Sequence, residues 1–251
     1  MAKRSARRAS RRLHENAHHS ETDNVRRLFD EPRWSPLEES NRDQKYRKNI
    51  RAQNASQQAM LDAIEETPLV FAVGSAGTGK TFIAVAKAIE ALDSGRVRRI
   101  VLSRPAVEAG ESLGFLPGDL EEKLAPYLRP LYDALCDRIS SKRLKVLLAE
   151  GVIEIAPIAY MRGRTLNNAY IVIDEAQNCT YGQLKMLLTR LGWNSSIVVT
   201  GDPEQSDLLP GLSGLSDVAE KLENLEKVEL IRFSRDDVVR HPLVAEMIDA
   251  L

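Results

Sequence analysis

The chain has 251 residues, 43% of them hydrophobic and 28% charged, which suits one globular domain with a full core plus attachments. No run of about 18 apolar residues occurs, so we expect no membrane span, and two cysteines without a pairing pattern favour the reducing cytoplasm over a disulfide-bonded fold. The net charge of −1 is uneven, because residues 1–12 carry six Lys or Arg and no acid, which leaves −7 on the rest.

The N-terminal segment, residues 1–50, is polar and charged and has almost no periodic apolar face, so we expect a basic, largely disordered arm. The remainder, 51–251, is expected to form one α/β domain. Its first element is a short helix over 57–66, which ends at Thr67 because the residue before a proline disfavours helical backbone. An apolar strand over 69–73 follows.

That strand runs directly into residues 74–81, GSAGTGKT, which fit the phosphate-loop pattern G-x-x-x-x-G-K-[ST] completely, and a helical pattern follows. In this context backbone N–H groups surround phosphate oxygens at a helix N-terminus. Lys80 is expected to reach the β- and γ-phosphates of ATP, and the Thr81 hydroxyl to bind Mg²⁺. The alternative is a glycine-rich turn that matches by chance. The expected nucleotide-binding residues of the loop are Gly74, Ser75, Ala76, Gly77, Thr78, Gly79, Lys80 and Thr81.

Strands and helices then alternate, which predicts α/β units around a mostly parallel sheet. Leucines at helical spacing over 120–135 predict a helix that Pro126 and Pro130 should kink or break. Thr180 and Gln183 form a capping box, and we expect their helix to run through Leu191 and to be capped by Gly192. The remaining expected elements are strands over 99–103, 152–156, 170–174, 197–200 and 226–231, a loop over 104–118 and a helix over 142–149.

Two carboxylates, Asp174 and Glu175, end the apolar run 170–174, where a parallel sheet places its ligands. We expect Asp174 to hold Mg²⁺ and Glu175 to orient the attacking water, whereas the alternative is a polar cap between strand and loop. Gln205 follows the next strand, where its amide is expected to contact the γ-phosphate.

Outside these motifs, Gln57 lies about twenty residues before the loop, and its amide suits the N6 and N7 edge of adenine. An ordinary exposed helix glutamine fits the residue equally well. Arginines at element ends, including Arg104, Arg232, Arg235 and Arg240, suit phosphates of nucleic acid or ATP, with surface salt bridges as the alternative.

Together these segments resemble the PhoH-like family of phosphate-starvation-associated ATPases, whose core is similar to the nucleotide-binding half of superfamily-1 helicases. The resemblance covers about residues 54–245 and implies ATP hydrolysis with Mg²⁺ and a role in RNA metabolism. It also implies that Gln57 reads adenine and that Arg240 acts as an arginine finger. The stretches that carry it are 74–81, 104–123, 156–166, 172–178, 199–208 and 233–244.

We therefore expect a single RecA-like P-loop NTPase domain that hydrolyses ATP and acts on or beside single-stranded RNA or another nucleic acid. One such domain covers only one side of ATP, so we expect a head-to-tail homo-hexamer in which Arg240 enters the neighbouring site. A translocating helicase is one alternative. The other is an ATP-dependent binding switch that gates a protein partner such as a nuclease, and it predicts no stimulation of ATPase by RNA.

Overall fold

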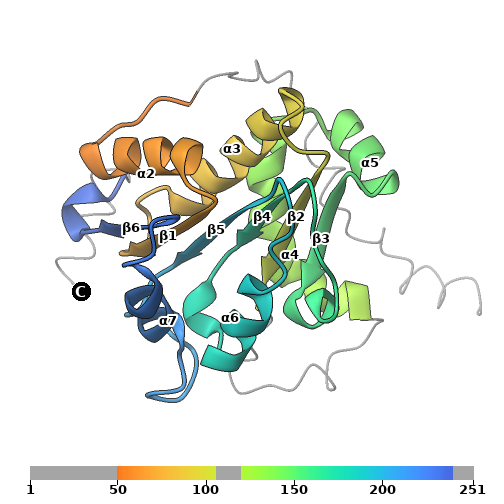
Figure 1. Cartoon of the computed structure of the whole chain (residues 1–251). Helices are drawn as coiled ribbons and strands as arrows, with labels where there is room; N and C mark the ends of the chain where they lie inside the picture. The colour runs from red at the N-terminus through yellow and green to blue at the C-terminus, as the bar shows by residue number, and fades with distance from the viewer. Residues whose placement is uncertain (1–49, 106–119, 240–251) are drawn as a thin grey trace, which may run out of the picture. The chain divides into compact units, whose positions relative to one another are not determined.

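The computed structural model of the chain describes residues 50–105 and 120–239 (Figure 1). The expected arm therefore lies outside the described residues, apart from Ile50, and so does Arg240. Among the residues described, no helix has both the length and the apolar character needed to cross a membrane. The elements are α2 (Ala55–Glu66), β1 (Leu69–Gly74), α3 (Lys80–Asp93), β2 (Arg99–Arg104), α4 (Leu120–Cys136), α5 (Ser141–Ala149), β3 (Ile153–Pro157), η2 (Ile158–Met161), β4 (Ala169–Ile173), η3 (Ala176–Asn178), α6 (Tyr181–Leu188), β5 (Ser196–Gly201), α7 (Leu215–Leu222), β6 (Val228–Phe233) and η4 (Arg235–Asp237).

The six strands form one sheet in the order β3-β2-β4-β5-β1-β6, and every pairing is parallel. The α/β fold expected from the sequence is confirmed, with a sheet that is wholly rather than mostly parallel. β1 lies between β5 and β6, so that Val73 pairs with Gly201 on one side and Gly74 with Phe233 on the other. Because all strands point the same way, the residues that follow β1, β2, β4 and β5 meet at one edge.

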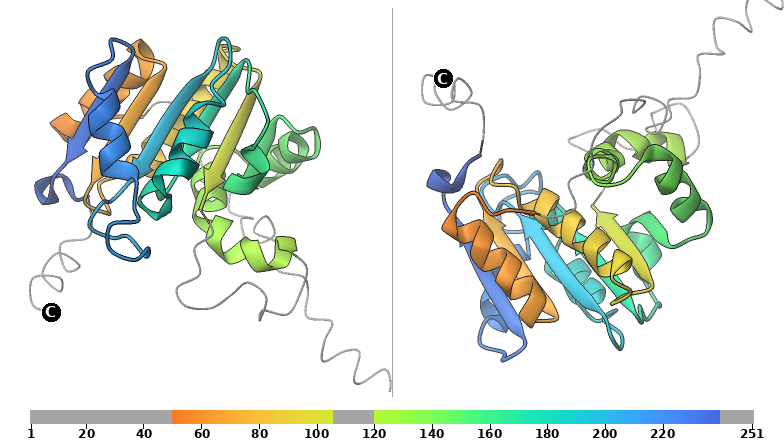
Figure 2. Two further views of the ribbon diagram at one scale, coloured as in Figure 1. Left: turned by 60° about the horizontal axis from the view of Figure 1, so that its bottom comes forward. Right: turned by 90° about the horizontal axis from the view of Figure 1, so that it is seen from above.

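Helices cover both faces of the sheet (Figures 1 and 2). α2 and α3 lie on one face, and α6 and α7 lie on the other. β4 is buried at all five positions, as expected for a central strand between two helical layers. On the α6 and α7 face, Phe71, Ile171 and Val199 belong to one buried cluster with Leu184 and Leu215. This core fixes the strand ends that carry the polar residues described below.

Two helices differ from the expectation. A kink or a break was expected at Pro126 and Pro130, and the break does not occur, because α4 is continuous through both residues. Pro130 is exposed, and its missing N–H removes a single hydrogen bond from a helix that is otherwise continuous. α6 ends at Leu188, before the expected Leu191.

Gly192 is accordingly not a helix cap, and close packing explains its presence. A Cβ at this position would lie 2.2 Å from Asn167 Oδ1 and 2.7 Å from the Leu166 carbonyl oxygen. The Gly192 N–H donates to that same carbonyl at 3.1 Å. The glycine therefore marks a close approach between two backbone segments, a role that the sequence pattern does not distinguish from a cap.

Candidate nucleotide-binding site

The loop between β1 and α3 depends on glycine at two places. Gly74 has φ of 125°, and a Cβ there would lie 1.9 Å from the carbonyl oxygen of Phe233 in β6. Gly79 is the N-cap of α3 and adopts left-handed backbone, with φ of 85°. Neither position accepts an L side chain without strain, so the local sequence dictates the tight turn that leads into the helix.

Lys80 is buried at the start of α3, and its ammonium points into the loop. Nζ donates to the carbonyl oxygens of Gly74 and Ser75, each at 2.7 Å, and to Thr78 Oγ1 at 3.2 Å. Burial lowers the pKa of Lys80, and the negative charges of Asp202, Glu175 and Asp174 oppose this shift. A cation that is partly desolvated beside acidic groups is suited to bind anionic phosphate oxygens.

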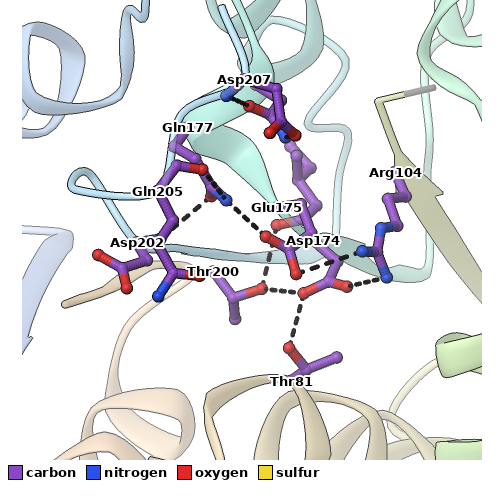
Figure 3. Close-up of polar contacts among 11 residues, drawn as sticks. Thr81, Arg104, Asp174, Glu175, Gln177, Thr200, Asp202, Gln205 and Asp207 are labelled. Carbon is purple, nitrogen blue, oxygen red and sulfur yellow. Dashed lines mark hydrogen bonds and ion pairs between the residues drawn. The ribbon is translucent and has the colours of Figure 1, made fainter. Parts of the chain in front are cut away.

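Asp174 directly follows β4, and its side chain contacts α3 through Thr81 and β5 through Thr200 (Figure 3). Its Oδ1 accepts hydrogen bonds from Thr81 Oγ1 at 2.6 Å and from Thr200 Oγ1 at 2.7 Å, and its side chain is 3% exposed. The hydroxyl and carboxylate are hard oxygen donors, and one or two such ligands plus phosphates suit Mg²⁺. Within the described ranges no three His, Cys, Asp or Glu side chains form a ready metal cluster. The residues present therefore fit a metal whose other ligands are phosphate and water.

Glu175 directly follows Asp174 and has left-handed backbone, with φ of 52°. This turn places the two adjacent carboxylates side by side, with Arg104 against both of them (Figure 3). Arg104 Nη2 lies 3.3 Å from Glu175 Oε1, and Nη1 lies 3.6 Å from Asp174 Oδ2. Gln177 Nε2 donates to the other oxygen of Glu175.

Gln177 and Asp202 were missed by the sequence reasoning, although both lie in stretches that it singled out. Gln177 Oε1 accepts from the Asp202 N–H at 3.0 Å, and Asp202 Oδ2 accepts from the Ala76 N–H of the loop at 3.0 Å. Gln177 Nε2 also donates to the Gln205 carbonyl at 3.3 Å. A chain of hydrogen bonds thus runs from the phosphate loop to Glu175. Most of these hydrogen bonds have a backbone atom as one partner. Because every residue carries such atoms, the sequence gives no indication of these bonds.

Gln57 is 5% exposed, so it is not the ordinary exposed helix glutamine that the sequence also allowed. Its Nε2 donates to the Thr78 carbonyl at 2.9 Å, and its Oε1 accepts from the Gln53 N–H at 2.9 Å. The amide therefore supports the outer side of the phosphate loop. The amide keeps a second N–H and a second lone pair on its oxygen, so these two bonds do not conflict with reading adenine. That role stays a prediction.

One pocket of about 240 Å³ brings most of the predicted site together. The loop residues Ala76, Gly77 and Gly79 line it, and so do the five side chains expected to act on ATP and its metal. Val239, just before Arg240, lies close by, since its N–H donates to the Gly77 carbonyl at 3.0 Å. The five side chains are Lys80, Thr81, Asp174, Glu175 and Gln205.

The parallel sheet and its glycine-rich loop define a RecA-like P-loop NTPase domain. Residues 49–251 match the family model described as PhoH-like protein, so the chain belongs to the PhoH-like family. It is 53% identical over 204 residues to a PhoH-like protein of Bacillus subtilis, a match that covers 81% of this chain and 64% of that protein. It is 45% identical over 212 residues to Protein PhoH of Escherichia coli, covering 83% and 60%.

The chain thus spans less than two thirds of these relatives' lengths. Among solved structures, it is similar to the large terminase of a thermophilic bacteriophage, with a TM-score of 0.52 and 14% identity. That similarity covers 80% of this chain and 50% of the terminase. At this identity the similarity concerns the fold alone.

Proposed function

We propose that this protein is a Mg²⁺-dependent ATPase. The observation that carries the proposal is the 2.6 Å hydrogen bond between Thr81 and Asp174, in the same pocket as Lys80 and Glu175. This pocket combines a cation, two oxygen ligands for a metal and a second carboxylate. Phosphoryl transfer to water needs these groups, since its catalysis consists mainly of positioning and charge stabilisation.

Each residue has a definite task in this proposal. The loop N–H groups bind the phosphates, and Lys80 leaves its carbonyl partners to neutralise charge on the β- and γ-phosphates. Thr81 and Asp174 hold the metal, which when bound neutralises phosphate charge. Glu175 accepts a hydrogen bond from the attacking water and so orients it towards the γ-phosphate. Gln205 contacts the γ-phosphate from the turn after β5.

The test of the ATPase proposal is Lys80→Ala, with Lys145→Ala as the control because Lys145 is exposed on α5. We expect Lys80→Ala to lower kcat by roughly 10²–10³-fold, the typical effect of removing one preorganised charge-stabilising group. The control should keep wild-type turnover, and circular dichroism should show both variants folded. Wild-type turnover in pure Lys80→Ala protein would exclude this site as the source of hydrolysis.

We further propose that hydrolysis is coupled to single-stranded RNA in the cytoplasm. The basic segment over residues 1–12 and the resemblance to the family support the RNA coupling, and the cysteine pattern supports the location. Stimulation of ATPase activity by RNA is the expected result. An ATPase rate that RNA does not change favours a nucleotide-gated switch for a protein partner.

Finally, we propose a head-to-tail hexamer in which Arg240 completes the neighbouring site. The other two late arginines have carboxylate partners within the chain, since Arg232 lies 2.8 Å from Glu223 and Arg235 lies 3.7 Å from Glu204. Val239, the last described residue, donates its N–H to the Gly77 carbonyl of the loop. An arginine finger supplied in trans raises rates by about 10³–10⁵-fold.

Mixing two inactive variants tests this assembly. Lys80→Ala protomers keep Arg240, and Arg240→Ala protomers keep Lys80, so mixed interfaces should contain complete sites. We expect each variant alone to be inactive and an equimolar mixture to recover activity. A mixture no more active than its components, or a fully active monomer by light scattering, contradicts the ring.

A further inference from the structure

Arg104 is the last residue of β2, next to the strand that carries both acidic site residues. β2 pairs with β4, and Ser103 stands opposite Ile173 in the register, so Arg104 and Asp174 are the next residues of adjacent strands. The Asp174 N–H donates to the Ser103 carbonyl at 2.9 Å, which extends the ladder to this point. The backbone therefore fixes Arg104 beside Asp174 independently of any side-chain contact.

The two oxygens of Asp174 have different partners (Figure 3). Oδ1 accepts from Thr81 and Thr200, whereas Oδ2 faces the Arg104 guanidinium at 3.6 Å. The second nitrogen of that guanidinium lies 3.3 Å from Glu175 Oε1. Lys80 Nζ bonds to backbone carbonyls instead, so across residues 50–105 and 120–239 Arg104 is the cation within salt-bridge distance of these carboxylates.

The ion pair between Asp174 and Arg104 is largely shielded from solvent. The Asp174 side chain is 3% exposed and that of Arg104 is 20% exposed, so solvent screens the pair only weakly. A buried carboxylate without a counter-ion is strongly unfavourable, and the guanidinium supplies that counter-ion here. The two distances of 3.3 and 3.6 Å exceed those of a tight charge-assisted hydrogen bond, so the contact can be exchanged for a better one.

We propose that Arg104 is the counter-ion of Asp174 while the site is free of metal. Mg²⁺ must displace Arg104 from Asp174, and Arg104 then keeps Glu175 oriented. This inference rests on the proposed ATPase function and adds a positioning residue to it. Asp174 Oδ1 already accepts two hydroxyl hydrogen bonds, so Oδ2 is the oxygen for which Mg²⁺ and the Arg104 guanidinium compete. After displacement, Arg104 retains Oε1 of Glu175 while Gln177 retains Oε2. The water-orienting carboxylate is thus held from two sides.

The test compares Arg104→Met, Arg104→Lys and the control Arg143→Met, which removes an arginine paired with Asp93 on the protein surface. A fluorescent ATP analogue, titrated with Mg²⁺ in each full-length protein, gives the half-saturating Mg²⁺ concentration without measuring turnover. We expect Arg104→Met to lower this concentration by roughly two- to ten-fold, because a partly buried competing cation is lost. We expect kcat to fall in the same variant, because Glu175 loses a partner.

The remaining outcomes separate the two proposals. Wild-type protein that binds the analogue equally with Mg²⁺ and with chelator contradicts the proposed function itself. If the wild type responds to Mg²⁺ but Arg104→Met has the same or a higher half-saturating concentration, the counter-ion role is wrong. Should Arg104→Met fail to fold, Arg104→Lys decides, since a single ammonium lacks the two nitrogens with which the guanidinium contacts the two carboxylates separately. Wild-type kcat in Arg104→Lys then overturns the proposal.

Discussion

At the scale of single residues, the site depends on which oxygen of each carboxylate has which partner. Asp174 uses Oδ1 for two hydroxyl groups, and Glu175 is held between Arg104 and Gln177. Neighbouring carboxylates of the same charge therefore have different surroundings. Asp174 is buried among donors, and Glu175 is partly exposed at the edge of the pocket. This difference supports the separate roles of metal ligand and water-orienting group.

Glu175→Gln tests that division of roles. We expect the variant to bind ATP with Mg²⁺ as the wild type does, because Thr81 and Asp174 remain. Turnover should fall by roughly 10²–10³-fold, since an amide is a poor acceptor for the proton of the attacking water. Binding of a fluorescent ATP analogue and phosphate release measure the two effects, with the exposed Glu226→Gln as control. Loss of ATP binding in Glu175→Gln would show that Glu175 holds the metal.

The sequence indicated many of the residues that line this pocket but few of the contacts between them. The loop residues, Asp174 and Glu175 were identifiable because a spacing pattern and a strand end mark them. Gln177 and Asp202 were not, because their partners include the backbone N–H groups of Asp202 and Ala76. The pairing of Arg104 with both carboxylates follows from the order of strands in the sheet, which no local pattern specifies.

At the scale of elements, several segments besides its own helix restrain the phosphate loop. Gln57 of α2 binds the Thr78 carbonyl, and the backbone of β6 passes directly beside Gly74. Val239, after β6, binds the Gly77 carbonyl. The Gln57 and Val239 contacts use loop carbonyls and occupy none of the loop N–H groups, whereas Asp202 accepts from the Ala76 N–H. Packing between elements therefore preorganises the loop.

Gly74→Ala should be far more destabilising than Gly95→Ala, and the pair forms a matched comparison. Both glycines have positive φ, at 125° and 74°, but a Cβ at Gly95 meets nothing within 4 Å. Gly95→Ala should cost about 1–2 kcal/mol of strain. Gly74→Ala adds a clash with the Phe233 carbonyl and should lower the free energy of unfolding by at least about twice as much. Urea unfolding measures both, and equal losses contradict the argument.

Most of the helices and strands were predictable from the sequence, and the errors have physical causes. α7 was missed because its N-cap is Gly214, which forms no side-chain cap, so the sequence lacks a start signal for a helix at Leu215. The capping box of Thr180 and Gln183 is confirmed, since local hydrogen bonds define it. The end of α6 was wrong because Gly192 serves a contact with residues distant in sequence.

At the scale of the whole molecule, charge is unevenly distributed along the sequence. Residues 1–12 carry six basic side chains and no acid, and they lie outside every nucleotide motif. The residues that line the pocket all belong to the domain that follows. ATP hydrolysis and attraction of nucleic acid should therefore be separable by deletion.

Deleting residues 1–20 should leave basal ATPase activity unchanged and weaken RNA binding. Six phosphate contacts to a single strand would contribute up to about four to the slope of log affinity against log salt concentration, and the deletion should remove that dependence. A variant in which Gln replaces the six basic residues keeps the length of the chain. It shows whether the loss of RNA binding comes from the lost charge or from the lost segment. RNA affinity that is unchanged across the salt series would assign residues 1–12 to solubility alone.

The position of β1 between β5 and β6 has a consequence for synthesis on the ribosome. The phosphate loop is encoded before residue 82, but its strand gains its two neighbours only when residues 196–201 and 228–233 arrive. Such distant pairings form slowly and late, because a long stretch of chain must be ordered first. A nascent chain therefore carries the complete loop sequence for most of its translation without the strands that shape it. We therefore expect nucleotide binding to begin only after β6 has emerged and paired with β1.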